Sequence, residues 1–273
     1  MPLPVLTKSL AGRIQQVLFS FQIAGAKAVQ HYPNNPFDMH LQHFGGATAY
    51  AARAIQGDGW WNRVVGFERE TASLLDPILS FFRSHHLCFY LDMDPTTLTE
   101  EIARLLIEKN LYPTPNGPFL YGLPQMSDPE PLFSNVEVRE TQDVDLFLDL
   151  WADGFEFPRN DLTNMLRQLK KGSFSLPENH LYLAYVDGLP AGIGALYIKD
   201  GIGHLNAGAT LPHFRNRGCH TALTAHRIAA AAQAQCELVT GDTGSPGSRS
   251  QHHMERAGLR IAFTRIMWVS RET

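Results

Sequence analysis

Long apolar runs, paired cysteines and an excess of basic charge are all missing from this sequence of 273 residues. No stretch offers the about 20 consecutive apolar residues that a membrane-spanning helix needs, so we expect a soluble protein with no membrane partner. Only three cysteines are present, Cys88, Cys219 and Cys236, and none forms a CxxC pair, which argues against a disulfide framework and favours a reducing, cytoplasmic setting. The net charge of −4 gives no basic footprint for nucleic acid, which we therefore do not expect as a partner.

Metal and dinucleotide motifs are incomplete as well. Histidine pairs occur at residues 40 and 43, 85–86 and 252–253. No carboxylate or cysteine set completes a four-ligand site around any of them, so we expect no bound metal. The glycine clusters at 45–47 and 57–59 lack the G-x-G-x-x-G spacing of a dinucleotide site and are interpreted as turns.

Length and proline content predict two domains. The chain is longer than the about 100–200 residues of one typical domain, and 44% apolar with 18% charged residues is a globular composition. Three prolines and little periodicity mark the segment from 122 to 131 as a linker. We place an N-terminal α/β domain at 1–124, the linker at 125–134 and a C-terminal domain at 135–273.

The C-terminal domain is predicted to follow the order β-α-α-β-β-β-α-β-α-β. Apolar runs at 180–186, 192–198 and 204–211, separated by Asp-Gly turns, are typical of an antiparallel meander. An alanine-rich helix at 221–235 follows, then a strand at 237–240, a helix at 250–257 and a last strand at 261–269.

The N-terminal domain mixes helices and strands. Helices are predicted at 10–30, 71–84 and 97–110, and strands at 45–51, 60–67 and 87–91. The helix–strand layout of residues 101–120 resembles that of residues 251–267, so the two halves are interpreted as diverged copies of one unit.

The segment from Thr210 to Thr221 joins an apolar strand to the alanine-rich helix. The first backbone N–H groups of such a helix are unpaired and carry partial positive charge, which suits a diphosphate. Gly218 lets the backbone approach an anion closely, and Arg215 and Arg217 add positive charge. The alternative for an isolated R-x-x-G match is a basic surface turn, and here the flanking strand and helix favour an anion site.

The sequence from Arg215 to His220, with Pro212 before it, resembles the R/Q-x-x-G-x-G/A coenzyme A loop of the GNAT acetyltransferases. His220 stands where that signature has Gly or Ala. Residues 250–259 are similar to the late helix of the family, which commonly reads Y-E-K-x-G-F, and Met254 replaces its tyrosine, which is proposed to protonate the departing thiolate. The resemblance implies the mixed α/β GNAT fold for 135–273, and a degenerate GNAT-like copy without the loop in 1–124.

The same resemblance implies an acetyl-CoA-dependent N-acetyltransferase. The acetyl group would pass directly to a primary amine of a small molecule or peptide in a ternary complex, with no metal. The pantetheine arm would run between two splayed strands, 209–211 and 238–242, and a backbone N–H near Ala209 or Thr210 would polarise the acyl carbonyl. The residues expected at the cofactor are Ala209, Thr210, Leu211, Arg215, Arg217, Gly218, Cys219, His220 and Thr221.

The acceptor amine must lose a proton before it attacks. His204 is the first candidate for the base, because strand parity predicts that His204, Asn206 and Thr210 face one side. Asp242 and Thr243 are second candidates, and a hydrogen-bonded structural histidine is the alternative for His204.

Other interpretations stay open at this point. A nucleophilic cysteine is conceivable at position 219, at the start of a helix, although the sequence offers it no partner histidine or acid. The family resemblance assigns acceptor choice to residues 153–160. Met254 and His220 also leave room for a non-catalytic CoA-binding or interaction module, and a longer acyl chain is a third possibility.

Overall fold

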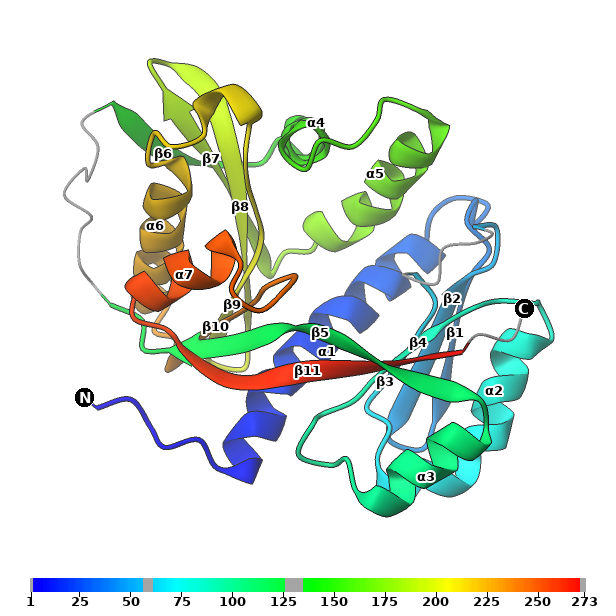
Figure 1. Cartoon of the computed structure of the whole chain (residues 1–273). Coiled ribbons are helices and arrows are strands. Elements are labelled where there is room, and N and C mark those ends of the chain that lie inside the picture. The colour runs from blue at the N-terminus through cyan, green and yellow to red at the C-terminus, as the bar shows by residue number, and fades with distance from the viewer. Residues whose placement is uncertain (1, 56–60, 126–134, 271–273) are drawn as a thin grey trace. The chain divides into compact units, whose positions relative to one another are not determined.

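The computed structural model describes residues 2–55, 61–125 and 135–270, and its helices and strands are labelled in Figure 1. These residues form two compact units. The C-terminal unit consists of Met1–Val5 and Pro118–Ala262, and the N-terminal unit consists of Leu6–Gly117 and Phe263–Thr273. Each unit has a hydrophobic core of its own, as the sequence predicts for two domains.

The C-terminal unit has the predicted order of helices and strands. Its elements are β6 (Val136–Thr141), α4 (Val144–Gly154), α5 (Asp161–Phe174), β7 (Asn179–Val186), β8 (Leu189–Lys199), β9 (Ile202–Thr210), the 3-10 turn η3 (Pro212–Phe214), α6 (Cys219–Gln233), β10 (Leu238–Asp242), α7 (Arg249–Arg256) and the start of β11 (Arg260–Ser270). Strands β6 to β9 pair antiparallel, and β10 runs parallel to β9. The side chains of Asp143, Asn160 and Ser248 accept backbone N–H bonds at the starts of α4, α5 and α7, which fixes where these helices begin.

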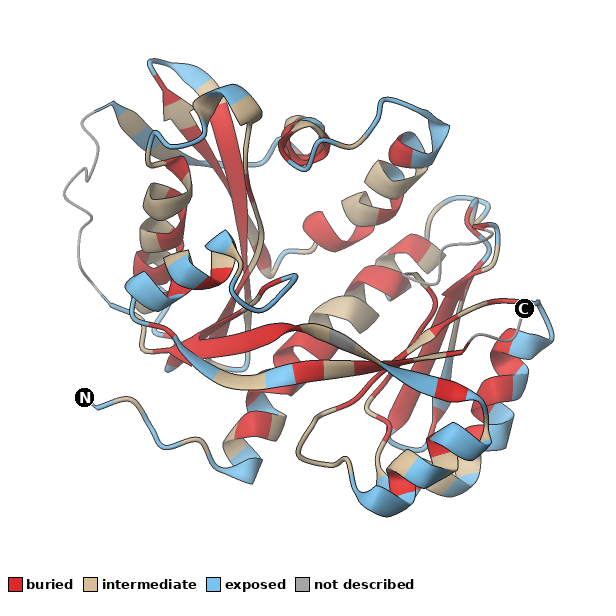
Figure 2. Cartoon of the chain, viewed as in Figure 1, coloured by how far each residue is buried: buried red, intermediate tan, exposed pale blue. Residues whose placement is uncertain are grey.

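Helices α4 and α6 cover opposite faces of this sheet. Successive strand residues point to opposite faces. A Cβ atom at Gly208 would meet α6 side chains, whereas the Cβ of the next residue, Ala209, lies against Gly154 of α4. In Figure 2 the central strands of this unit are mostly buried, and each of its helices has one buried face and one more exposed face.

The N-terminal unit contains α1 (Lys8–Gln30), β1 (Met39–Phe44), β2 (Ala47–Ala52), β3 (Arg63–Val65), the 3-10 helix η2 (Arg69–Leu74), α2 (Leu75–Arg83), β4 (Tyr90–Asp92), α3 (Glu100–Glu108) and the start of β5 (Leu111–Gly122). Strands β1, β2 and β3 are antiparallel neighbours, and β4 runs parallel to β3. In the part of the chain that the structure describes, no helix combines the length and the apolar character that crossing a bilayer requires.

Each unit completes its sheet with a strand end from the other half of the sequence. The end of β5 pairs antiparallel with β10 in the C-terminal unit, and the end of β11 pairs antiparallel with β4 in the N-terminal unit. The strand orders, β7-β8-β9-β10-β5 and β1-β2-β3-β4-β11, are therefore equivalent, and both contain one parallel pair. This topology supports the interpretation of the halves as diverged copies.

The domain boundaries expected from the sequence, at 124 and 135, differ from the boundaries of these two units. The sequence pattern of a strand does not reveal which sheet the strand joins. Of the expected linker, residues 126–134 lie outside the described residues. Two local predictions also need correction. Strand β1 was not predicted, because its polar residues hide the apolar alternation that is typical of a strand. One of these polar residues, His43, has its Nδ1 atom 3.0 Å from Thr48 Oγ1 on the neighbouring strand. The helix expected at 71–84 is divided into η2 and α2.

Candidate functional site

The central feature of the C-terminal unit is an unpaired edge on β9. Strands β9 and β10 pair from Ile202 with Leu238 up to Leu205 with Gly241. Beyond that point β9 continues to Thr210, and β8 is its one strand neighbour among the described residues. The two parallel strands therefore part after Leu205 and Gly241, and the backbone of the last β9 residues faces the gap. Of the two segments that the family resemblance implies to splay, 209–211 lies beyond this point, whereas 238–241 is paired with 202–205.

A β-bulge shapes this free edge. Between the pairs Ala195 with Asn206 and Ile193 with Ala209, β9 has one residue more than β8, and Ala207 takes a positive φ of 50°. The extra residue reverses the side-chain parity. Asn206 and Ala209 thus share a face, and the prediction that Thr210 faces the same side as His204 and Asn206 is wrong.

The bulge also selects which amide faces the gap. Leu211 N–H donates to Ala191 C=O at 2.9 Å, so these two residues form a hydrogen-bonded pair. Such pairs alternate along an antiparallel ladder. The intervening pair of Gly192 with Thr210 is therefore non-hydrogen-bonded, and the Thr210 amide points away from β8, toward the gap. Of the two predicted candidates for the amide that polarises an acyl carbonyl, this geometry favours Thr210 over Ala209.

The loop after β9 presents a run of free amides at the start of α6. Gly218 caps the helix with a φ of 87°, and Asn216 also has a positive φ of 63°. Among the described residues, no backbone or side-chain acceptor takes the N–H groups from Asn216 to Thr221, whereas Ala222 N–H bonds to Gly218 C=O. Such a concave run of donors at a helix N-terminus binds phosphate groups.

The two loop arginines are placed differently from each other. Arg215 Nη2 donates to Glu156 Oε2 at 2.9 Å and to Gly154 C=O at 3.3 Å, so it connects this loop to the segment between α4 and α5. Arg217 is exposed, with its guanidinium 5.4 Å from the centre of the Phe214 ring. Neither side chain is locked in the core. Contact with the segment assigned to acceptor choice was not predicted for Arg215.

His220 does not supply a positive charge to this site. Its ring lies 4.7 Å from that of His253, and its pKa falls to about 3, chiefly because of burial and secondly because of the nearby Arg227. The ring is therefore neutral at pH 7. The structure does not support an ionic contact of this imidazole with phosphate, and His220 contributes its backbone N–H instead.

Cys219 is equally unsuited to act as a nucleophile. Its side chain is 1% exposed, and burial raises the pKa of the thiol, against smaller opposing effects of its own backbone N–H and of Arg217. A neutral, buried thiol is a poor nucleophile. The Cys219 alternative thus loses its physical basis, and its expected role at the cofactor rests on its backbone N–H.

Several buried polar atoms near the gap have no partner among the described residues. They are both amide atoms of Asn206, Thr210 Oγ1 and Thr243 Oγ1. Buried polar groups are normally hydrogen-bonded, so an unsatisfied group calls for an explanation. The amides and carbonyls of a pantetheine arm would satisfy such atoms, which fits the site to coenzyme A.

The two predicted catalytic residues lie together. His204 is fully buried, its Nδ1 is 3.0 Å from Thr240 Oγ1, and its Nε2 is 3.4 Å from Asp242 Oδ1. The ring also stacks on Phe119 at 5.7 Å. Because the Asp242 side chain is 31% exposed, it is the member of the pair that can meet a substrate. His204 is placed to orient Asp242 rather than to take a proton from an amine directly.

Met254 takes a core position. Its side chain is 5% exposed, and a Cβ atom at Gly241 would lie 2.9 Å from its Cε. A buried thioether cannot donate a proton. This position therefore has no proton donor in place of the tyrosine of the family, and the Met254 side chain packs against β10 at Gly241.

The described residues of the N-terminal unit differ from the C-terminal unit at the corresponding strand edge and helix start. Strand β3 ends at Val65, which still pairs with Asp92 of β4, so no free strand edge extends beyond the parallel pair. At the start of η2, Thr71 N–H donates to Glu68 C=O at 3.0 Å and Glu68 N–H donates to Thr71 Oγ1 at 2.9 Å, so both of these amides have partners within the chain.

One group of positions nevertheless recurs in both units. In the C-terminal unit His204 contacts Asp242 and stacks on Phe119, the residue that pairs with Asp242. At the same places in the N-terminal unit, Arg63 Nη1 lies 3.1 Å from Asp92 Oδ2 and 3.5 Å from the sulfur of Met267, the residue that pairs with Asp92. The equivalence gives the diverged-copy interpretation a residue-level basis.

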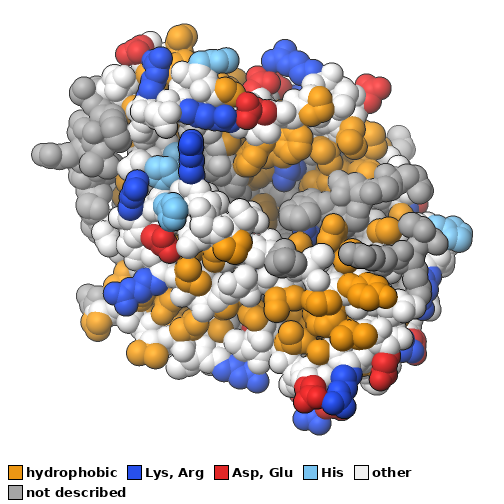
Figure 3. Space-filling view, in the orientation of Figure 1, with side chains coloured by type: hydrophobic (Ala, Val, Ile, Leu, Met, Phe, Trp, Pro, Cys, Tyr) orange, Lys and Arg blue, Asp and Glu red, His pale blue; other side chains and the backbone are white. Residues whose placement is uncertain are grey.

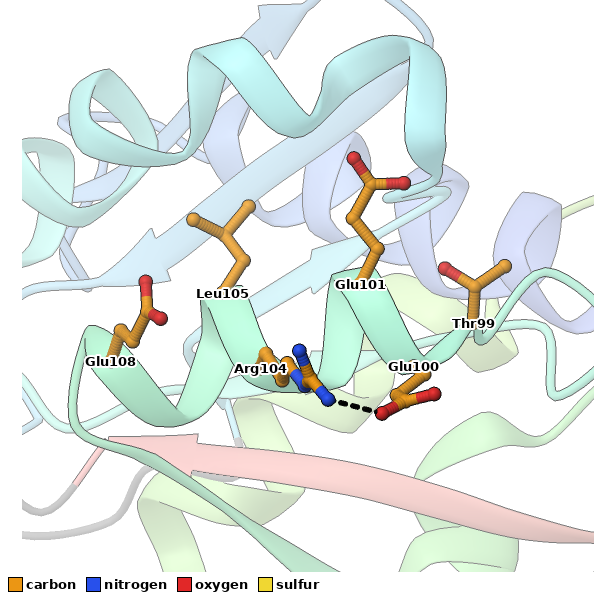
Figure 4. Close-up of a pocket in the computed structure, with 6 residues that line it drawn as sticks. All are labelled: Thr99, Glu100, Glu101, Arg104, Leu105 and Glu108. Carbon is orange, nitrogen blue, oxygen red and sulfur yellow. Dashed lines mark hydrogen bonds and ion pairs between the residues drawn. The ribbon is translucent and has the colours of Figure 1, made fainter.

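A depression along α3 belongs to the N-terminal unit and has a different character. Figure 4 shows that Glu100, Glu101 and Glu108 line it, with Arg104 paired to Glu100 at 2.5 Å. A mainly acidic, exposed helix face of this kind does not suit a diphosphate. On the face drawn in Figure 3, basic and acidic side chains are interspersed. Among the described residues, no three His, Cys, Asp or Glu side chains are grouped to hold a metal ion.

Comparison with solved structures supports the fold. A GCN5-related N-acetyltransferase from Kribbella flavida is similar with a TM-score of 0.65 and 15% identity, over 97% of this chain and 96% of its own. A tandem GNAT protein from the clavulanic acid biosynthesis pathway gives a TM-score of 0.60 at 13% identity, over 95% and 96%. A functionally unknown protein from Staphylococcus epidermidis gives 0.61 at 13%, over 87% and 96%.

At identities of 13–15% these similarities show the fold alone, and one of the three structures is described as a tandem GNAT protein. A comparison with curated proteins gave no match. The model of the acetyltransferase (GNAT) family matches residues 144–259, which include the free β9 edge and the amide loop. This chain therefore contains a domain of the GNAT acetyltransferase family at residues 144–259.

Proposed function

We propose that the protein is an acetyl-CoA-dependent N-acetyltransferase acting on a primary amine of a small molecule or peptide. One observation carries this proposal: the free β9 edge leads directly into the unpaired amides of residues 216–221. In this arrangement the amides hold the diphosphate and the edge pairs with pantetheine. Three free cysteines are consistent with a cytoplasmic setting.

The reaction follows from these positions. The amine nitrogen attacks the thioester carbonyl carbon, the Thr210 N–H stabilises the negative charge on the carbonyl oxygen, and the C–S bond breaks to release CoA as a thiolate. One proton leaves the amine and one proton restores the thiol, so the products are an amide and CoA. In the proposed mechanism Asp242 accepts the proton of the amine, and His204 positions Asp242 from behind.

Asp242→Asn should lower kcat/KM for the amine by about 100-fold, because an amide cannot accept the proton and a general base contributes about 10²–10⁴-fold. Asp187→Asn, in the turn between β7 and β8, is the matched control and should keep the wild-type rate. The measurement is a pH profile of kcat/KM with a saturating acyl donor. Equal rates for Asp242→Asn and wild type would remove Asp242 from the mechanism.

Two measurements test the proposed function itself. Isothermal calorimetry with acetyl-CoA should show binding, and incubation with acetyl-CoA and a panel of primary amines should release free thiol. Absence of acetyl-CoA binding by the wild type would refute the proposal. A parallel thermal-shift series with acyl-CoA of increasing chain length tests whether acetyl is the preferred group.

A non-catalytic CoA-binding module is the second candidate function. The buried Met254 favours it, because the site has a thioether where an acid is expected. Acetyl-CoA binding without thiol release on any amine of the panel would support this candidate, and turnover on any amine would exclude it.

A further inference from the structure

Arg227 is a buried arginine in the middle of α6. Its side chain is 1% exposed and lies between Leu223 and Ala231 on the stripe of the helix that packs on the sheet. Burial lowers the pKa of its guanidinium to about 10, and the group remains charged at pH 7. Charged side chains are rarely buried without an ionic partner, and among the described residues no carboxylate pairs with this one.

The guanidinium binds backbone carbonyls of both β8 and β9 at one end of the β-bulge. Nη1 donates to Ala195 C=O and to Asn206 C=O, at 3.0 Å each, and Nε donates to Leu223 C=O at 3.0 Å. Ala195 and Asn206 are the last partners before the register shifts. Arg227 therefore ties β8 to β9 at the place where β9 begins to bulge.

Two glycines make room for this side chain. A Cβ atom at Gly194 would lie 2.8 Å from Cζ and Nε of Arg227, and one at Gly208 would lie 3.4 Å from Nη2. Nη2 has no acceptor among the described residues, and it lies next to the segment of β9 that has left β10. The positive charge of Arg227 therefore lies next to Gly208, which precedes Thr210 by two residues on the free edge of β9.

We propose that Arg227 is a positioning residue for acyl transfer. It fixes the bulge that turns the Thr210 amide to the gap, and its charge favours the negative charge that develops on the thioester oxygen. This inference rests on the proposed function. It also explains why an alanine-rich helix carries an arginine on its buried stripe.

The experiment compares Arg227→Met, which keeps volume and loses charge, with Arg227→Lys. Arg227→Met should lower kcat by about 10- to 100-fold, since small displacements in a site cost up to about 10² in rate. Its KM for acetyl-CoA should stay near the wild-type value, and Arg227→Lys should recover part of kcat. Arg139→Met, which removes an exposed arginine of β6, is the control.

A second readout needs no activity. Hydrogen exchange of the β9 amides from 206 to 210 should become faster in Arg227→Met and stay unchanged in Arg139→Met. Unchanged exchange together with unchanged kcat would overturn the inference. Equal losses in both Arg227 variants, accompanied by loss of acetyl-CoA binding, would also overturn it, because they indicate a purely structural role. Failure of the proposed function is recognised separately, by the absence of acetyl-CoA binding in the wild type.

Discussion

Gly218→Asp is expected to abolish acetyl-CoA binding in calorimetry. Gly218 has a φ of 87° and opens α6, so a side chain here is strained and projects where a diphosphate would lie. The aspartate adds a negative charge at the amides that would receive the anion. Backbone strain of about 1–2 kcal/mol and like-charge repulsion act together, and binding should fall below detection.

Two variants separate these effects. Gly218→Ala carries the strain without the charge, so its binding should weaken by roughly tenfold, as about 1.4 kcal/mol corresponds to a factor of ten. Gly188→Asp introduces the same charge at another glycine with a φ of 78°, in the turn between β7 and β8, and should bind as the wild type does. Retained affinity in Gly218→Asp would show that the loop does not hold the diphosphate.

The loop could be predicted because its signal is local. A strand, an R-x-x-G segment and an alanine-rich helix follow one another in sequence, and helix-start amides are free in any such turn. The splay of β9 from β10 was expected from the family resemblance and agrees with the strand pairing. The element order of the C-terminal unit is readable for the same reason, since each element carries its own apolar period.

Features that depend on long-range strand pairing could not be predicted from the sequence, for a physical reason. A β-bulge adds one residue to β9 without a sequence signature, and that residue reverses the facing of Thr210. The pairing of His204 with Asp242 depends on the register of two strands joined by a long helix. Arg227 did leave a signal, because the spacing Leu223, Arg227, Ala231 places a charge on the buried stripe. The alanines at 222, 225, 229 and 232 instead indicate a different apolar face of the same helix.

The pairing of β5 with β10 and of β11 with β4 also could not be predicted from the sequence. The pairing of β11 with β4 contributes to a buried ionic group in the N-terminal unit. Asp92 is fully buried and accepts hydrogen bonds from Arg63 of β3 and from Arg265 of β11. The group therefore joins β4 to both of its neighbouring strands. One buried carboxylate thus connects three strands of this unit.

Asp92→Ala should destabilise the protein by about 3–5 kcal/mol, because it removes a fully buried carboxylate that pairs with two buried guanidinium groups. The measurement is the free energy of unfolding from chemical denaturation. Asp76→Ala, which breaks an exposed pair with Lys109 at 2.6 Å, is the control and should cost about 2 kcal/mol or less, including its effect on the start of α2.

Replacing Asp92, Arg63 and Arg265 together by Leu, Met and Met tests the cause. Well-packed apolar side chains often substitute for a buried ionic group with little loss of stability, so the triple variant should be more stable than Asp92→Ala. If it is less stable than the single variant, the loss in Asp92→Ala does not arise from stranded charge. In that case the packing of β4 between β3 and β11, rather than the ion pairs, holds this sheet together.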